Sequence, residues 1–348
     1  MMVRFSDIIG DKPKKERESP SSEENSRIQE LRISDINSTE TVKTDSFSEL
    51  VSDDSGSEGL KLRYKKLFGK ALDIRDRIKK NLGIIHSPVL SELHNIINDD
   101  LIDVLYDYAI SSPGEGELPW HTTCVTLGSM KIGKGLGYNT KSLLELGLGA
   151  FFENIGMYKI PDRILEKKER LNPDELAEVR KHPEICFRIL GGKEGPLPWL
   201  AEVALQIHER SDGSGYPKGL KGEKISEYAS IIGIMDTFMA MIKPRAYRDK
   251  YLQTNAVKNI IGLEGKFPQK VVKGFLNQIS LFPINTYVRL TNNSIGKVIS
   301  TDKVQPLRPT IALLYDGLGE KLEKREIIHL SKSPLLHIVD TLDEKELS

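Results

Sequence analysis

The spacing of apolar residues changes once along this chain, close to Leu281, and this change divides the sequence into two structural classes. Between Leu60 and Leu281 apolar residues recur at intervals of three and four, a spacing that predicts amphipathic helices. Gly, Pro and Asn-Pro interrupt the pattern at the helix ends. We therefore expect an all-helical region with helices over 121–137, 142–155, 173–191, 198–209, 225–242 and 254–262.

Apolar and polar residues alternate beyond Leu281 in short segments separated by turn-forming residues: TYVRLT, GKVIST, TIALLYD and EIIHLS. Alternation in segments rich in Val, Ile, Thr and Tyr predicts antiparallel strands. The expected fold class is therefore mainly α, with a multi-helix domain followed by a small antiparallel β module.

Residues 1–60 differ in composition from the rest of the chain, with 12 Ser, 14 acidic and 8 basic residues. Such a segment cannot bury enough apolar surface to offset the entropy lost on folding. We predict a disordered acidic tail; a tethered partner-binding segment near Ile28 to Ile36 is the alternative. The expected division is a disordered tail over 1–60, a helical segment over 61–115, a helical domain over 116–281 and the β module over 282–348.

Charge, cysteine content and hydropathy exclude several classes of protein. The chain carries 50 basic and 50 acidic side chains, so no net charge favours a nucleic-acid partner. The two cysteines, Cys124 and Cys186, provide neither a disulfide framework nor a cysteine-based zinc ribbon. Apolar stretches are interrupted before the roughly 18–20 residues that a membrane helix needs, and no signal peptide is recognisable. We expect a cytoplasmic protein that binds neither nucleic acid nor a membrane.

Three histidines and one aspartate fall on different predicted helices: His121, His182, His208 and Asp236. Apolar residues flank Asp236, and a buried carboxylate needs a cation or several hydrogen bonds. If the helices pack as a bundle, these side chains converge into a nitrogen and oxygen site suited to Fe, Mn or Zn. The alternative is that each His is an ordinary core or surface residue.

A glycine-rich loop follows His208. Its glycines allow the backbone to approach a ligand, Arg210 and Lys218 are suited to hold phosphate oxygens, and Tyr216 is suited to stack on a base. The simpler interpretation is a helix end followed by a tight turn. The candidate ligand-binding residues of this loop are Glu209, Arg210, Asp212, Gly213, Gly215, Tyr216, Pro217 and Lys218.

The run HERSDGSGYPKGLKG at 208–222 resembles the signature of the HD-GYP family, bacterial phosphodiesterases that hydrolyse cyclic di-GMP within a superfamily of metal phosphohydrolases. The blocks GLGAFFENIGMYKIPDRIL, LNPDELAEVRKHPEICFRIL and ISEYASIIGIMDTFMAMIKPRAYR are similar to further motifs of the family, in the same order. The resemblance covers about 90–282 and implies an HD-type multi-helix domain.

The resemblance assigns metal binding to His121, His182, His208 and Asp236, which match family ligands. Other family positions differ in this chain. The family's His-Asp pair reads Glu153-Asn154, the first His of a His-His pair reads Ile207, a Lys reads Met157 and a further Asp reads Met239.

These departures remove electron-pair donors that a two-metal centre needs. In the family the Asp of the pair bridges two ions, and the neutral amide of Asn154 is a poor bridge. Ile207 supplies no donor, whereas Glu153 offers a carboxylate that Fe and Mn accept. We therefore expect one divalent ion, Fe, Mn or Zn, with Glu153 and Asn154 as remnants of the catalytic pair. The expected metal ligands are His121, Glu153, His182, His208 and Asp236.

The loop that would face the ligand matches the family, as do Arg245, Tyr247 and Arg248. A chain that keeps these groups and loses metal donors is better suited to binding than to hydrolysis. We therefore predict a protein that binds cyclic di-GMP, or docks with partner signalling proteins through its GYP loop, with little or no hydrolysis. An active metal-dependent phosphodiesterase with a rearranged site is the alternative, and a purely structural helical module is the third. A homodimer formed through the β module is left open.

Overall fold

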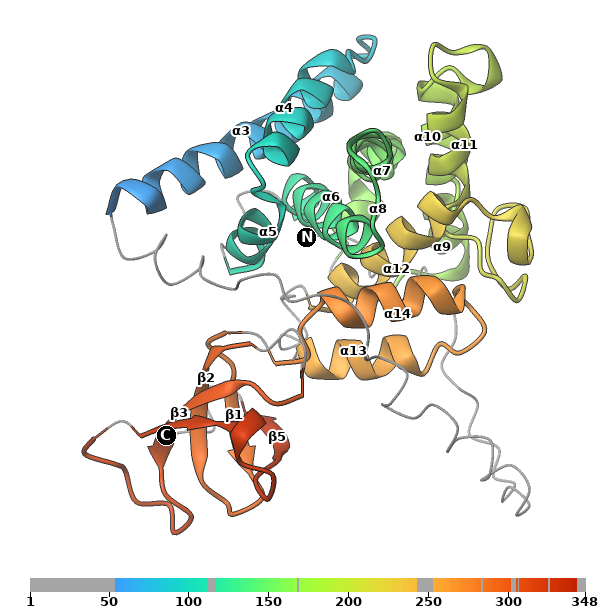
Figure 1. The fold of residues 1–348 in the computed structure, drawn as a ribbon. Coiled ribbons are helices and arrows are strands. Elements are labelled where there is room, and N and C mark those ends of the chain that lie inside the picture. The colour runs from blue at the N-terminus through green and yellow to red at the C-terminus, as the bar shows by residue number, and fades with distance from the viewer. Residues whose placement is uncertain are drawn as a thin grey trace, which may run out of the picture. The chain divides into compact units, whose positions relative to one another are not determined.

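The computed structural model describes residues 54–111, 117–167, 169–242, 253–282, 284–301, 305, 307–324 and 326–342. The tail predicted over 1–60 lies almost wholly outside these residues. The predicted fold class is confirmed: the described part of the chain is mainly helical and continues into a small antiparallel sheet (Figure 1).

The helices follow one another along the chain. They are α3 (Asp54–Lys79), α4 (Ser87–Asn98), α5 (Ile102–Ser111), α6 (Glu117–Gly135), α7 (Thr140–Phe152), α8 (Asp162–Leu165), α9 (Pro173–Val179), α10 (His182–Ile189), α11 (Pro198–Gln206), α12 (Glu227–Ile242), α13 (Gln253–Ile261) and α14 (Gln269–Gln278). Residues 207–226, which include the glycine-rich loop, connect α11 to α12. Among the described residues, no helix combines the length and the apolar character that crossing a membrane requires.

Helices α6 and α12 form the centre of the helical region. Residues 118–133 of α6 and 229–240 of α12 are buried throughout, as expected of helices that other helices cover on all sides. The buried hydroxyl of Thr126 satisfies its hydrogen bond within α6, on the carbonyl oxygen of Thr122 at 2.7 Å. Met235 of α12 packs directly on Gly128 of α6. This close contact brings the middle of α6 and the middle of α12 into one core.

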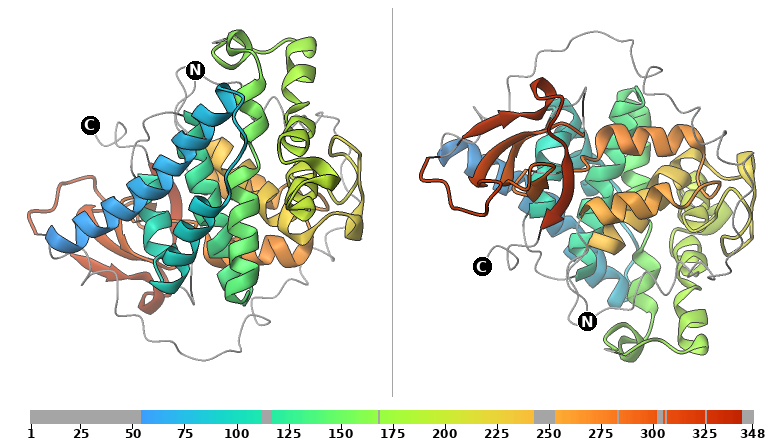
Figure 2. Two further views of the ribbon diagram at one scale, coloured as in Figure 1. Left: turned by 90° about the horizontal axis from the view of Figure 1, so that it is seen from above. Right: turned by 90° about the horizontal axis from the view of Figure 1, so that it is seen from below.

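Other helices cover this central pair. Helices α5 and α7 pack on α6, α14 contacts both α6 and α12, and α11 contacts α7 and α12. The orange helices α13 and α14 lie side by side over one face of the centre (Figure 2). The arrangement encloses one large apolar core, so polar side chains of α6 and α12 that point inward are removed from water.

Three details of the predicted helices are corrected. The helix predicted over 173–191 is two helices, α9 and α10, because Pro183 lies in the first turn of α10, where its missing N–H costs nothing. The helix predicted over 142–155 ends at Phe152, and Glu153 follows as its C-cap. Helix α14, which is amphipathic, was not among the predicted segments.

The C-terminal sheet has the strand order β4-β3-β2-β1-β5, with all pairs antiparallel. The strands are β1 (Tyr287–Leu290), β2 (Ile295–Ser300), β3 (Thr310–Tyr315), β4 (Ile327–His329) and β5 (Ile338–Leu342). Alternate residues such as Val288, Leu290 and Val298 are buried in the module's own apolar cluster. The alternation in the sequence therefore predicted the first four strands, while β5 was missed.

Candidate metal centre

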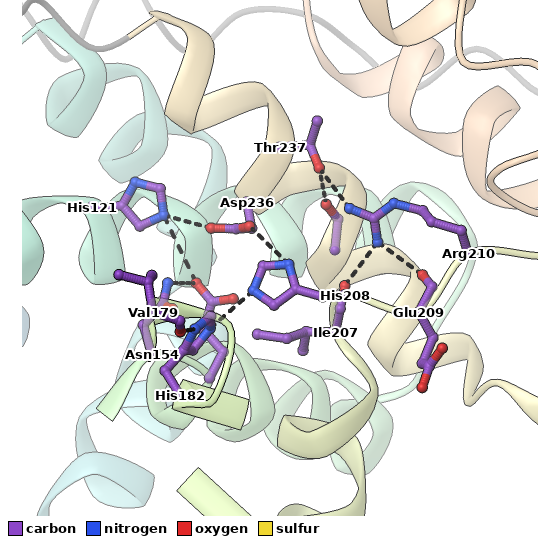
Figure 3. Close-up of polar contacts among 12 residues, drawn as sticks. His121, Asn154, Val179, His182, Ile207, His208, Glu209, Arg210, Asp236 and Thr237 are labelled. Atoms are coloured by element: carbon purple, nitrogen blue, oxygen red, sulfur yellow. Dashed lines mark hydrogen bonds and ion pairs between the residues drawn. The ribbon is translucent and has the colours of Figure 1, made fainter. Parts of the chain in front are cut away.

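His121 and Asp236 meet at the crossing of the two central helices. His121 lies in the first turns of α6 and Asp236 in the middle of α12. The Nε2 atom of His121 is 2.8 Å from Oδ1 of Asp236 (Figure 3). Both side chains are almost completely buried, so the carboxylate that the sequence placed among apolar residues does have a polar partner.

Glu153 adds a second buried carboxylate to this pair. It directly follows α7, and its Oε1 lies 4.0 Å from Nε2 of His121. One donor atom from each of His121, Glu153 and Asp236 lies within 4.8 Å of the other two, a grouping that could hold a metal ion. Asn154 donates a hydrogen bond from Nδ2 to the same Oε1 atom at 3.0 Å.

His182 and His208 extend the group. Their Nε2 atoms are 2.9 Å apart, and Nδ1 of His208 is 4.0 Å from Oδ2 of Asp236 (Figure 3). Nδ1 of His182 donates to the carbonyl oxygen of Val179 at 2.8 Å, which leaves its Nε2 as the atom able to bind a cation. The structure thus brings together all the residues that the sequence assigned to the metal: His121, Glu153, His182, His208 and Asp236.

Burial sets the protonation of the group. It lowers the pKa of His182 to about 4, and it lowers the pKa of His208 well below the usual value, with the charges of His182 and Arg210 adding to the effect. Both rings are therefore neutral at pH 7, the form that binds metals. Burial and the nearby Asp236 carboxylate raise the pKa of Glu153. Two buried carboxylates repel each other, and a cation between them relieves that repulsion.

Several buried atoms of this group have no hydrogen-bond partner among the described residues: Glu153 Oε2, Asn154 Oδ1, His208 Nδ1 and Asp236 Oδ2. An unsatisfied buried polar atom is costly, and all four can donate an electron pair to a cation. The two carboxylates balance the charge of one divalent ion. A second divalent ion would leave uncompensated charge in a buried site, which is expensive. The donor set therefore fits one divalent ion.

Three of the positions that depart from the family pattern are filled by buried apolar side chains. Ile207 and Met239 are fully buried in the main apolar core. Met157 is fully buried in a second apolar cluster with Leu118 and Ile160. Here the structure places methyl and thioether groups where the family has ligands or a cation.

A thiol that the sequence gave no reason to select holds the Glu153 segment in place. The Sγ–H of Cys186 donates to the carbonyl oxygen of Glu153 at 2.9 Å, and the backbone N–H of Gly156 donates to the same sulfur at 3.0 Å. Burial raises the pKa of Cys186 to about 12, so the group remains a thiol. Cys186 lies on α10, one turn after His182, and it links the two ligand-bearing segments.

Gly156 is a position where a side chain is not tolerated. A Cβ atom there would lie 2.2 Å from the carbonyl oxygen of His182. We expect Gly156→Ala to lower the free energy of unfolding by about 2–3 kcal/mol, measured by urea denaturation. Gly69→Ala on α3, where a Cβ atom meets nothing within 4 Å, is the matched control and is expected to be neutral or stabilising. Equal stability of the two variants would contradict this packing.

The GYP loop is held by two of its own charged residues, which point into the protein. The Glu209 carboxylate accepts hydrogen bonds from the backbone N–H groups of Lys218 at 2.7 Å and Leu220 at 2.9 Å. The Arg210 guanidinium is buried and donates to the carbonyl oxygens of Ile207 at 3.1 Å and Glu209 at 2.8 Å. We expected Arg210 to hold phosphate oxygens; the structure instead places it on backbone carbonyls.

Among the other loop residues, two glycines are required by the backbone conformation, and two charged side chains are exposed. At Gly215 a Cβ atom would lie 2.4 Å from the backbone nitrogen of Arg210, and Gly213 has a φ of 85°, so both positions require glycine. Asp212 and Lys218 are exposed. Pro217 is half-buried. The expected ligand residues Arg245, Tyr247 and Arg248 lie outside the described residues.

Tyr216 also differs in position from the expectation. Its ring stacks on His208, with 4.8 Å between ring centroids and 11° between planes. The Arg180 guanidinium lies over the same ring at 5.4 Å. These contacts occupy ring surface that a nucleotide base would need for stacking.

The inward carboxylate of Glu209 yields a prediction for the loop. Glu209→Ala leaves the N–H groups of Lys218 and Leu220 without their acceptor. We expect a loss of about 2–3 kcal/mol in stability and faster hydrogen exchange at these two amides. Glu223→Ala, at an exposed position further along the loop, is the control and should change neither. Unchanged exchange at Lys218 and Leu220 in the Glu209 variant would contradict the geometry.

Family models and known proteins identify the domain that carries this site. Residues 114–269 match the model described as HD domain, and residues 287–348 match the KOW domain associated with HD domain. The chain therefore contains an HD domain with strong homology to the cyclic di-GMP phosphodiesterases of HD-GYP type, and the resemblance seen in the sequence is confirmed.

Two curated relatives illustrate the homology. Cyclic di-GMP phosphodiesterase PdeB from Borreliella burgdorferi is 32% identical over 208 residues, covering 59% of this chain and 54% of that protein. A cyclic di-GMP phosphodiesterase from Thermotoga maritima is 34% identical over 215 residues, covering 61% of this chain and 56% of that protein. The chain thus spans about half the length of these relatives.

A solved structure shares the fold. Bd1817, an HDG"Y"P protein from Bdellovibrio bacteriovorus, aligns with a TM-score of 0.53 and 17% sequence identity, covering 66% of this chain and 76% of that chain. At this identity the likeness concerns the fold alone. It agrees with the mainly helical architecture described above.

Proposed function

We propose that this chain is an HD-GYP-type protein of cyclic di-GMP signalling that binds the nucleotide with little or no hydrolysis. Relatives named as cyclic di-GMP phosphodiesterases support the choice of nucleotide. The observation that carries the second part is the pair of buried side chains at 154 and 207, an amide and an aliphatic group, within the donor cluster. We also propose that the protein is cytoplasmic and that its chain divides into the four segments predicted from the sequence.

The buried cluster is suited to hold one divalent ion through His121, Glu153, His182, His208 and Asp236. Such an ion would supply a Lewis-acid contact for one phosphate oxygen of the ligand. The hydrogen bond from His182 to Val179 orients its ring, and the bonds of Cys186 hold Glu153. Fast hydrolysis of phosphodiesters commonly uses two ions a few Å apart that clamp the attacking and leaving oxygens. Asn154 offers a neutral oxygen in place of a charged bridging carboxylate, and Ile207 offers no donor for that second ion.

The exposed part of the loop is the second element of this proposal. Asp212 and Lys218 remain accessible, whereas Glu209 and Arg210 are engaged within the protein. Partner signalling proteins that dock on the GYP loop would therefore contact Asp212 and Lys218. A homodimer remains part of the same set of proposals.

An active metal-dependent phosphodiesterase is the second candidate function. One observation favours it: the donors converge in spite of the departures, and Glu153 takes the place of a family His within 4.0 Å of His121. Under this alternative the single ion and the surrounding carboxylates are sufficient for turnover.

Turnover separates the two functions. Purified protein loaded with Mn²⁺ or Fe²⁺ is mixed with cyclic di-GMP, binding is measured by calorimetry, and the nucleotide is analysed by chromatography. We expect the nucleotide to bind and to remain intact. Formation of the linear dinucleotide or GMP that His182→Ala or Asp236→Ala abolishes would establish the alternative and overturn the proposal.

A further inference from the structure

A pocket open to solvent lies where helices α7, α11 and α12 meet. Its volume is about 410 Å³, within the range of sites for small organic molecules. The lining residues are Glu145 from α7, Trp199, Glu202 and Val203 from α11, and Ser226 and Tyr228 at the start of α12. None of these six residues belongs to the candidate metal centre, so the pocket is a separate site.

The lining of the pocket carries negative charge. Glu145 and Glu202 are half-buried, and none of the six described lining residues has a cationic side chain. The exposed Lys141 has its Nζ atom 3.9 Å from Oε1 of Glu145, and the exposed Lys218 has its Nζ atom 3.8 Å from Oε2 of Glu202. Both distances are longer than a hydrogen bond, and exposed ion pairs contribute little. Both carboxylates can therefore accept hydrogen bonds from a cation that enters the pocket.

Two aromatic side chains select the kind of cation. Trp199 and Tyr228 are half-buried, so part of each side chain remains accessible. The face of a Trp ring attracts an ammonium or guanidinium group most strongly, and a Tyr ring attracts it less. A hard divalent ion, by contrast, binds several oxygen ligands and gains nothing from a ring face. Carboxylates together with aromatic rings therefore favour an organic cation.

Hydrogen bonds hold the pocket in shape. The Tyr228 hydroxyl donates to Oε2 of Glu145 at 3.0 Å, which joins α12 to α7. The backbone N–H of Ser226 donates to Oε1 of Gln206 at 2.8 Å, which joins the start of α12 to the end of α11. The Tyr138 ring packs edge-on against Tyr228, with 5.9 Å between ring centroids. Because these side chains are already positioned, binding a ligand requires little further ordering of the pocket.

We propose that this pocket binds a small organic cation, with a primary ammonium or guanidinium group held by Glu145 and Glu202 against the Trp199 ring. Free amines and the arginine side chains of polypeptides both supply this chemistry. The site does not rest on the proposed function, because none of its residues contributes to the metal centre or to the GYP loop.

NMR of the indole N–H groups tests the site on the full chain, which contains two tryptophans. Trp199 lines the pocket, whereas Trp120 is buried and donates to the carbonyl oxygen of Ala109 at 3.0 Å. Titration with putrescine is expected to shift the Trp199 signal until it saturates and to leave the Trp120 signal in place. Nα-acetylarginine methylamide represents the second source, and the probe that binds more tightly identifies the source. Neutral acetamide should shift neither signal.

Charge-removing variants complete the test. Glu202→Gln keeps the size of the side chain and is expected to weaken putrescine binding about three- to fivefold, the upper range for an exposed ion pair. The double variant Glu145→Gln with Glu202→Gln should lose the saturable shift. Glu184→Gln, at an exposed position on α10, is the matched control and should bind like the wild type. The proposal is overturned if neither cation shifts the Trp199 signal, if acetamide shifts it equally, or if the double variant binds like the wild type.

Discussion

Replacing Asn154 by Asp together with Ile207 by His is expected to create a second metal site and to start hydrolysis of cyclic di-GMP. The Asp supplies a charged oxygen in place of an amide, and the His supplies a donor where the structure has an aliphatic group. A second ion contributes several kcal/mol of transition-state stabilisation. At about 1.4 kcal/mol per tenfold in rate, we expect a gain on the order of a hundred- to thousandfold, measured by chromatography of the products.

The single variants serve as controls for this gain. Ile207→His alone adds a donor without a bridging carboxylate, and Asn154→Asp alone adds charge without the His. Each is expected to stay near the wild-type rate. The prediction fails if the wild type already hydrolyses the nucleotide as fast as the double variant, provided that circular dichroism shows both to be folded.

Loss of metal-dependent stabilisation in Asp236→Asn is the second large effect. In the wild type, an ion present at about a hundred times its Kd adds about 2.7 kcal/mol to the free energy of unfolding. For a domain of this size that raises Tm by about 5–10 °C. Asp236→Asn keeps an oxygen 2.8 Å from His121 but removes the charge that the ion needs. We expect no rise in Tm on adding Mn²⁺ to this variant.

The control for that experiment is Asp73→Asn, which changes an exposed carboxylate on α3 to the same amide. It is expected to keep the whole metal-dependent rise in Tm. An Asp236→Asn variant that retains this rise would show that the ion binds elsewhere, and it would remove Asp236 from the set of ligands.

The sequence was sufficient to predict the fold class. The metal site stays a prediction, and the five side chains assigned to it lie close together in the structure. Apolar residues at intervals of three and four indicate helices, and alternating apolar residues indicate strands, because an element that buries one face repeats its apolar residues with its own period. Asp236 was selected because an aspartate among apolar residues needs a partner, and His121, His182 and His208 because they fall on different predicted helices. The contact between His182 and His208 was not predicted, since no local pattern places two distant helices next to each other.

The loop shows what the sequence could not give. A glycine-rich run with Glu, Arg and Tyr fits both a ligand-facing surface and a tightly braced turn, and the residues alone do not distinguish them. The structure turns Glu209 and Arg210 inward, where they bind backbone groups. Cys186 was not selected because its role arises only from contacts between segments distant in the chain. The match of the loop to the family is therefore weaker support for nucleotide binding than we expected. The altered metal site is the stronger support for a protein with little or no hydrolysis.

The number of ions held per chain tests the central claim most directly. Native mass spectrometry of protein reconstituted without oxygen in excess Fe²⁺ or Mn²⁺, then desalted, counts tightly bound ions. One ion per chain is the predicted result, with none retained by Asp236→Asn. Two ions per wild-type chain, both lost on replacing buried ligands such as His182 or Asp236, would contradict a centre limited by Asn154 and Ile207.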